Sequence, residues 1–134
     1  MEIFLPTVRA VIRIHAAESR ERRTAPGIRD QGLLESAIGR AASHLAHADA
    51  PTLASAAASL AYGLAKNHPF VDGNKRASYL VTNAFLEVHG QSLAQIDEDA
   101  RVAVWLSLAD GSLSEAELCE WIANSCRPIG QSGG

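Results

Sequence analysis

The sequence predicts an all-α protein, a compact single domain of about six helices. Apolar residues recur at spacings of three and four through most of the chain, the pattern of helices with one buried face. No stretch of useful length alternates apolar and polar residues as a half-buried strand does. The 134 residues and the 47% hydrophobic content suffice for one core, and abundant alanine with 5% aromatic residues favours closely packed helices. We expect the domain to span residues 1–127 and residues 128–134 to form a flexible tail.

The first three helices are expected to begin at residues that often start helices. Pro6 lies near the first turn of a helix that breaks at Pro26 and Gly27. Asp30 is placed to cap a second helix, and Pro51 to open a third. The histidine of the first helix shares its apolar face, so we expect it to be packed in the core. The inward faces are Val8, Val11, Ile12 and His15, then Leu34, Ala37, Ile38, Ala41 and Leu45, and then Leu53, Ala57, Leu60, Ala61 and Leu64.

The last three helices have equally clear ends. The fourth ends at Gly90, and the fifth runs from about residue 97 to Gly111, where glycine suits a helix C-terminus. Ser114 and Glu117 form a capping box that starts the sixth helix. The expected buried faces are Ala77, Leu80, Val81, Ala84, Phe85 and Val88, then Val102, Trp105, Leu106 and Ala109, and then Leu118, Trp121, Ile122 and Cys126.

Composition and charge exclude several classes of function. The net charge of −3 gives no electrostatic basis for direct nucleic-acid binding. The N-terminus lacks the basic region and apolar run of a secretory signal. The most apolar window, residues 53–65, is too short and too rich in serine to cross a bilayer. We therefore expect a cytoplasmic protein with no membrane partner.

The segment at residues 68–76 reads His-Pro-Phe-Val-Asp-Gly-Asn-Lys-Arg and carries most of the functional information. It lies where a loop becomes the fourth helix, whose first turn has unpaired N–H groups and the positive end of the helix dipole. Such a helix start binds anions, most often phosphate. Gly73 lets the backbone approach a ligand closely, and Lys75 and Arg76 add positive charge.

Two further residues of this segment are suited to chemistry. Asp72 can hold a magnesium ion, which prefers carboxylate and phosphate oxygens. His68 is the residue of the segment suited to act as a general base near neutral pH. Each residue alone also has a structural explanation, since aspartate caps helices and a histidine before proline is common in surface loops. Capping alone does not require the whole combination, so we predict an anion site with a nearby base.

The same nine residues resemble the signature of the Fic/Doc family: histidine, any residue, phenylalanine, any residue, an acid, and then Gly-Asn-Gly/Lys-Arg. Lysine at position 75 is similar to the Doc, or death-on-curing, branch of the family. The likeness covers roughly residues 3–126, nearly the whole chain, and a nine-residue match is far more specific than a lone glycine motif. The resemblance implies a Fic fold in which the motif loop leads into a central helix.

The resemblance also implies a role for each motif residue. His68 matches the general base that takes a proton from a protein hydroxyl. Asp72 matches the acid that holds Mg²⁺ on the phosphates of ATP. Gly73 and Asn74 match the backbone and amide of the anion cradle, and Arg76 matches the arginine that pairs with phosphate oxygens.

Three further positions separate the branches of the family. Lys75 stands where adenylyl-transferring members have glycine, and the resemblance implies that it directs the γ-phosphate of ATP toward the histidine. Lys66 lies where the Doc prototype has an arginine, so it is a further candidate for phosphate binding. Leu80 departs from the family, because adenylylating relatives have an arginine there and the Doc prototype an asparagine. This departure argues further against adenylylation.

The function implied is that of a toxin in a type II toxin–antitoxin system. Such a toxin phosphorylates a translation factor, elongation factor Tu in the family, and stops protein synthesis. Its partner is an antitoxin whose helical tail would lie in an apolar groove on the helical bundle. Two alternatives are adenylyl transfer to a protein target and a non-catalytic protein that binds the antitoxin and co-regulates its own promoter through it.

Overall fold

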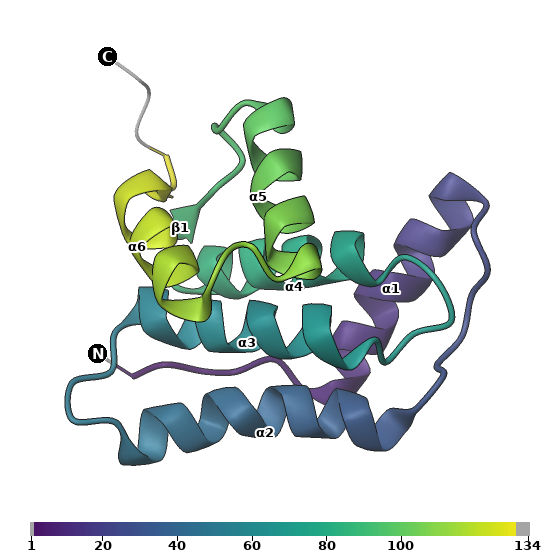
Figure 1. Ribbon diagram of the computed structural model, residues 1–134, viewed down its shortest axis with the longest axis horizontal. Coiled ribbons are helices and arrows are strands. Elements are labelled where there is room, and N and C mark those ends of the chain that lie inside the picture. The colour runs from purple at the N-terminus through teal and green to yellow at the C-terminus, as the bar shows by residue number, and fades with distance from the viewer. Residues whose placement is uncertain (1, 131–134) are drawn as a thin grey trace.

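The computed structural model describes residues 2–130 and confirms the all-α prediction (Figure 1). Six helices and one very short antiparallel strand pair make up these residues. None of the helices in this part of the chain has the length and apolarity that crossing a bilayer requires. In chain order the elements are α1 (Val8–Arg22), α2 (Gln31–His47), α3 (Leu53–Asn67), α4 (Asn74–Val88), β1 (Gln91–Ser92), α5 (Glu98–Asp110), α6 (Glu115–Ser125) and β2 (Arg127–Pro128).

Side-chain caps set the starts of five helices. The side chain of Asp30 accepts a hydrogen bond from the backbone N–H of Leu33, as expected for the cap of α2. The predicted capping box of Ser114 and Glu117 starts α6, with both of its hydrogen bonds present. Thr7, Thr52 and Asp97 cap α1, α3 and α5 in the same way. The start of α4 has no side-chain cap, and this difference marks the site described below.

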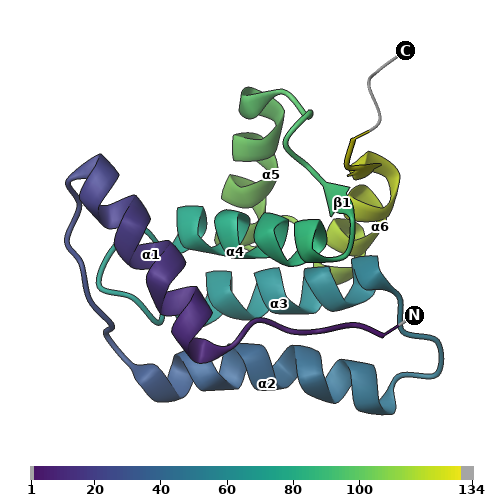
Figure 2. The same ribbon diagram turned by 180° about the vertical axis from the view of Figure 1, so that it is seen from behind.

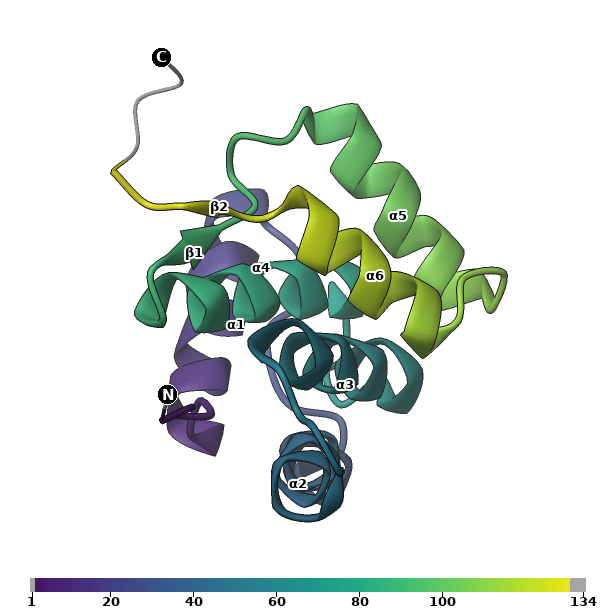
Figure 3. The ribbon, with the colours of Figure 1, turned by 90° about the vertical axis from the view of Figure 1, so that its left-hand side faces the viewer.

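Helices α2, α3 and α4 are stacked in that order, with α3 in the middle (Figures 1 and 3). α1 packs against α4 and also contacts α2 (Figure 2). α5 and α6 pack against α3, and α5 also contacts α4. The loop between α3 and α4 therefore lies at one end of the stack, beside α1 and the connection into α2. α3 is the most enclosed helix, and the motif loop connects it to α4.

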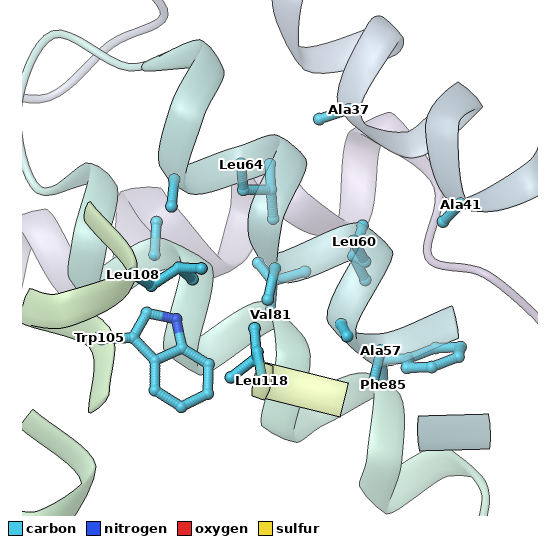
Figure 4. Close-up of a cluster of buried hydrophobic side chains, with 14 of the residues drawn as sticks. Ala37, Ala41, Ala57, Leu60, Leu64, Val81, Phe85, Trp105, Leu108 and Leu118 are labelled. Atoms are coloured by element: carbon cyan, nitrogen blue, oxygen red, sulfur yellow. The ribbon is translucent and has the colours of Figure 1, made fainter. Parts of the chain in front are cut away.

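The interior around α3 is built from small side chains that let the helices approach closely. Gly63 of α3 faces Ala37 of α2, and a Cβ added to this glycine would lie 3.1 Å from the Ala37 Cα. Larger side chains fill the space between α3, α4, α5 and α6 (Figure 4). The buried side chains there include Ala57, Leu60, Leu64, Val81, Phe85, Trp105, Leu108 and Leu118.

The predicted buried face of α5 is confirmed at Trp105 and wrong at Val102 and Leu106. Val102 and Leu106 are 45% and 47% exposed, whereas Trp105 and Leu108 are buried. The inward stripe is instead residues 101, 104, 105 and 108, which has the same helical spacing but begins at Arg101. The sequence pattern selects the neighbouring stripe because that stripe is wholly apolar. Val88 was also expected to be buried and is 71% exposed, because the buried face of α4 runs through Phe85 and Leu86.

Residues 127–129, at the predicted boundary, contact the segment that follows α4. β1 and β2 pair antiparallel, with Pro128 opposite Gln91. The N–H of Ile129 then donates a hydrogen bond to the carbonyl of Gly90. The first residues of the expected tail are thus attached to the end of α4. The rest of that tail, residues 131–134, lies outside the described residues.

Candidate functional site

The motif loop begins where α3 ends at His68. His68 adopts the left-handed conformation, with φ 49° and ψ 56°, and its side chain is exposed. The carbonyls of Asn67 and His68 accept hydrogen bonds from the guanidinium of Arg29, at 2.9 and 2.7 Å. The end of α3 is therefore fixed by a residue from the segment before α2.

Hydrogen bonds to the same segment hold the next part of the loop. Phe70 forms an antiparallel bridge with Ile28, and the N–H of Val71 donates to the carbonyl of Gly27 at 3.1 Å. The side chain of Asn74 accepts from the N–H of Phe70 and donates to its carbonyl, at 2.9 and 3.0 Å. The amide of Asn74 was expected in the anion cradle. It is engaged in closing the loop, which leaves the backbone N–H of this residue for a ligand.

A buried histidine of α1 supports the loop from below. His15 is 3% exposed, as expected for a core histidine, and its ring stacks on that of Phe70 at 3.8 Å between centroids. Its Nε2 donates a hydrogen bond of 2.7 Å to the carbonyl oxygen of Asp72. The backbone of the candidate magnesium ligand is thus positioned by a residue 57 positions earlier in the chain.

The first turn of α4 presents an open anion site. Gly73 is the N-cap in the left-handed conformation, with φ 73°. It has no side chain to accept the first N–H groups of the helix, so the N–H groups of residues 74–76 have no partner in residues 2–130. The Gly73 N–H itself donates to the Asp72 carboxylate at 2.7 Å. These groups and the helix dipole favour an anion, as the sequence predicts.

A cleft of about 740 Å³ opens in front of this helix start. Six of the seven predicted site residues line it, and α5 and the second turn of α4 form its other wall. From the motif, the lining residues are His68, Val71, Asp72, Gly73, Asn74, Lys75 and Arg76, and from the other wall they are Tyr79, Leu80, Glu98, Arg101, Val102, Trp105, Leu106 and Ala109.

Lys66 is the predicted phosphate-binding residue that the structure does not bring to the cleft. Its Nζ lies 5.7 Å from the centre of the Tyr62 ring and faces Gly111, at the start of the connection between α5 and α6. The pKa of nearby Asp110 is lowered mainly by hydrogen bonds from Ser112, with the Lys66 charge adding to the effect. Lys66 therefore interacts with the end of α5, although it lies only two residues before His68 in sequence.

Arg76 reaches the cleft but also has a protein partner. Its Nε lies 3.2 Å from the carboxylate of Glu18 on α1, which is also 2.6 Å from the Nε of Arg22. The pair fixes the direction of the Arg76 side chain from α1. No ion pair to Lys75 occurs within residues 2–130, so its charge is available to a ligand.

A sequence model of the Fic/DOC family matches residues 5–86, more than half of the chain, and the match includes the whole motif. The chain belongs to the Fic/DOC family. It is also 43% identical over 68 residues to "Toxin Doc" of Mycolicibacterium smegmatis (strain ATCC 700084 / mc(2)155). The aligned part is 50% of this chain and 52% of that protein, so the chain spans about half the length of the curated relative it matches.

The match to the Fic/DOC family ends within α4, so the α5 wall of the cleft lies outside it. This wall contains Arg101, which the sequence analysis did not select. One signal was present in the sequence, since Arg101 lies four residues before Trp105 on the stripe that turns inward. His15 was selected only as a core residue, because its contact with Asp72 depends on how α1 packs against the loop.

Proposed function

We propose that this chain is the toxin of a type II toxin–antitoxin system and transfers the γ-phosphate of ATP to a hydroxyl of a translation factor, elongation factor Tu. The observation that carries the proposal is one cleft lined by an exposed histidine, a carboxylate and an open helix N-terminus beside a lysine. The name of the relative, Toxin Doc, supports the toxin assignment. Members of the Fic/DOC family are typically transferases that act on proteins.

In this proposal the chain's own residues bind the nucleotide, orient it and move one proton. The backbone N–H groups of residues 74–76 and the charge of Lys75 bind the phosphate chain. Nε2 or Nδ1 of His68 takes the proton of the target hydroxyl. As that oxygen bonds to the γ-phosphorus, the bond to the β–γ bridging oxygen breaks and ADP leaves. The loop contacts of His15, Arg29 and Asn74 keep these groups in place.

The residues present fit a magnesium ion that is bound together with the nucleotide. One oxygen of the Asp72 carboxylate accepts from Gly73, and the side chain is exposed, so the other oxygen is available to a cation. Within residues 2–130 no three His, Cys, Asp or Glu side chains are grouped to hold a metal by themselves. Mg²⁺ is commonly held by one or two carboxylates plus substrate phosphates, a donor set that Asp72 and ATP supply together. When bound, the ion would neutralise charge on the phosphates.

Phosphoryl transfer is favoured over adenylyl transfer by two cleft residues. Lys75 puts a long cationic side chain where a glycine would leave open space, which favours a bound terminal phosphate. Leu80 also lines the cleft, and its side chain has no group that binds phosphate. Adenylyl transfer is the competing chemistry, and the mass of the modified target distinguishes the two.

The partner in this proposal is an antitoxin with a helical tail that binds an apolar groove. Within residues 2–130 the large exposed apolar side chains form two groups, Val71, Val102 and Leu106 lining the cleft, and Phe4, Val88 and Ile129 near the end of α4. Either group offers apolar area to an amphipathic helix. Such a partner would order on binding.

The test is the intact mass of purified elongation factor Tu after incubation with the chain, ATP and Mg²⁺. We expect the mass of one phosphate to be added by the wild type and none by His68→Ala. The His68 side chain is exposed, so the variant should keep the wild-type melting temperature. His47→Ala, at the end of α2 and outside the cleft, is a matched control and should keep full activity. An adenylyl mass would replace the kinase assignment, and an unmodified target with a toxic, folded His68→Ala would favour the non-catalytic alternative.

A further inference from the structure

Arg101 of α5 has fewer hydrogen-bond and ion-pair partners than its burial calls for. Its guanidinium lies 5.0 Å from the centre of the Tyr79 ring, and Nη1 donates a hydrogen bond to the Tyr79 hydroxyl. Its Nε is buried and is one of two buried side-chain polar atoms without a partner in residues 2–130. No carboxylate of these residues forms an ion pair with it. Arg101 is thus a half-buried cation that lacks a counter-ion.

A second arginine of the same chain also lies over a tyrosine ring but has a carboxylate partner. Arg40 of α2 lies 4.9 Å from the centre of the Tyr62 ring, nearly the same geometry. It also forms an ion pair with Glu115 of α6 and lies outside the cleft. Charged groups that leave water are normally paired, because an unpaired charge loses its hydration without compensation. Nε itself is closed off from solvent, so a ligand would contact the other nitrogens of the guanidinium, and its negative charge would supply the missing counter-ion from the cleft that Arg101 lines.

The cleft places Arg101 within reach of an anion bound at the start of α4. Tyr79 follows Lys75 by four residues, so the two side chains lie on the same face of α4 about one turn, or 5.4 Å, apart. Arg101 of α5 lies over the ring of that tyrosine, on the side of the cleft that faces the motif. A chain of phosphates bound at the N–H groups of residues 74–76 would reach Arg101 by running along this face past Lys75. Leu80, the next cleft residue of α4, offers such a chain no donor.

We propose that Arg101 binds the polyphosphate chain of the nucleotide from across the cleft, as a second cation supplied by α5. The inference rests on the proposed function, because it assigns a residue to the same nucleotide. The planar guanidinium has donors to spare after the bond to Tyr79, and arginine is the side chain best suited to two-point contact with phosphate. The Tyr79 ring and its hydroxyl hold the guanidinium in a fixed orientation, which reduces the entropy lost on binding.

The test is calorimetric binding of ATP, inorganic tripolyphosphate and adenosine to the full chain in the presence of Mg²⁺. Arg101→Gln should weaken the binding of both ATP and tripolyphosphate by roughly tenfold to a hundredfold, the range for hydrogen bonds to charged groups. Arg101→Lys should give an intermediate loss, because lysine keeps the charge without the planar fork. Arg40→Gln is the matched control, an arginine over a tyrosine outside the cleft, and should bind both ligands as the wild type does. Adenosine binding should be the same in all variants.

A purely structural role of Arg101 gives a different pattern. Tyr79→Phe removes the hydroxyl contact and leaves the ring, so it reports on the packing of α5 against α4. If Arg101→Gln and Tyr79→Phe lower the melting temperature alike and both bind tripolyphosphate within twofold of the wild type, the inference about Arg101 is wrong. If Arg101→Gln does not fold, Arg101→Lys decides, and unchanged affinity overturns the inference. If the wild type binds neither ATP nor tripolyphosphate, the proposed function itself is wrong. If the wild type binds both and Arg101→Gln binds them equally well, only the inference about Arg101 is wrong.

Discussion

The interior around α3 and the motif loop are held together by different kinds of interaction. The interior is apolar and closely packed, and its contacts are made by many small residues such as Ala57 and Gly63. The loop at residues 68–73 is held by a small number of hydrogen bonds, among them those of His15, Arg29 and Asn74. The interior therefore depends on volume, whereas the shape of the loop depends on individual polar groups. Variants in the two regions should separate stability from ligand binding.

The largest expected effect is at Phe70, where the two regions meet. Its side chain belongs to the loop but is only 1% exposed and stacks on His15. Phe70→Ala should lower the free energy of unfolding by about 3–5 kcal/mol, the usual cost of removing a buried aromatic side chain. It should also weaken nucleotide binding, because the loop loses its anchor. Urea denaturation followed by circular dichroism measures the first effect. A decrease in unfolding free energy below about 1 kcal/mol would show that the Phe70 side chain is not packed in the core.

A smaller effect is expected from a pair of glycine substitutions that tests close packing alone. Overpacking at Gly63→Ala costs about 1–3 kcal/mol, because the new methyl would lie 3.1 Å from the Ala37 backbone. The better helix propensity of alanine offsets about 1 kcal/mol of this cost, so we expect the free energy of unfolding to fall by up to about 2 kcal/mol. Gly39→Ala, on α2 with nothing within 4 Å of the added Cβ, is the control and should stabilise the protein by about 0.5–1 kcal/mol. Equal gains at both positions in chemical denaturation would contradict the close approach of α2 and α3.

The smallest effect on stability is expected at His15, where the effect on binding should be larger. His15→Phe keeps a ring against Phe70 but loses the hydrogen bond to the Asp72 carbonyl, a change of about 0.5–1.5 kcal/mol in unfolding free energy. Binding of ATP with Mg²⁺ should weaken by up to about tenfold, because Asp72 is no longer held.

His89→Phe is a suitable control for this comparison. His89 also bonds to backbone groups, of Phe4 and Phe85, but lies at the far end of α4. It should lose similar stability and bind ATP normally. Equal binding by both variants would mean that His15 acts only as a core residue.

The sequence was a good guide to the helices and to most of the motif. Caps such as Asp30 and Ser114 act within three or four residues, so local sequence is enough to locate the helix starts. Six of the seven predicted site residues share the cleft because the motif is continuous in sequence.

The remaining features depend on tertiary packing. The inward face of α5 runs through Arg101 because of where that helix packs, and apolar periodicity cannot select a charged residue. Lys66 lies two residues before His68, yet its side chain interacts with the end of α5. The bond from His15 to Asp72 joins residues that no local pattern relates.

The left-handed backbone at His68 has a consequence for how such a chain evolves. A residue other than glycine in this conformation costs about 1–2 kcal/mol, and the Arg29 hydrogen bonds hold the chain in it. Glycine would relieve this strain and remove the imidazole. Selection for stability alone would therefore replace His68, while selection for a proton acceptor at the cleft would retain it. Under the proposed role of His68, the most stable residue at this position and the functional one differ.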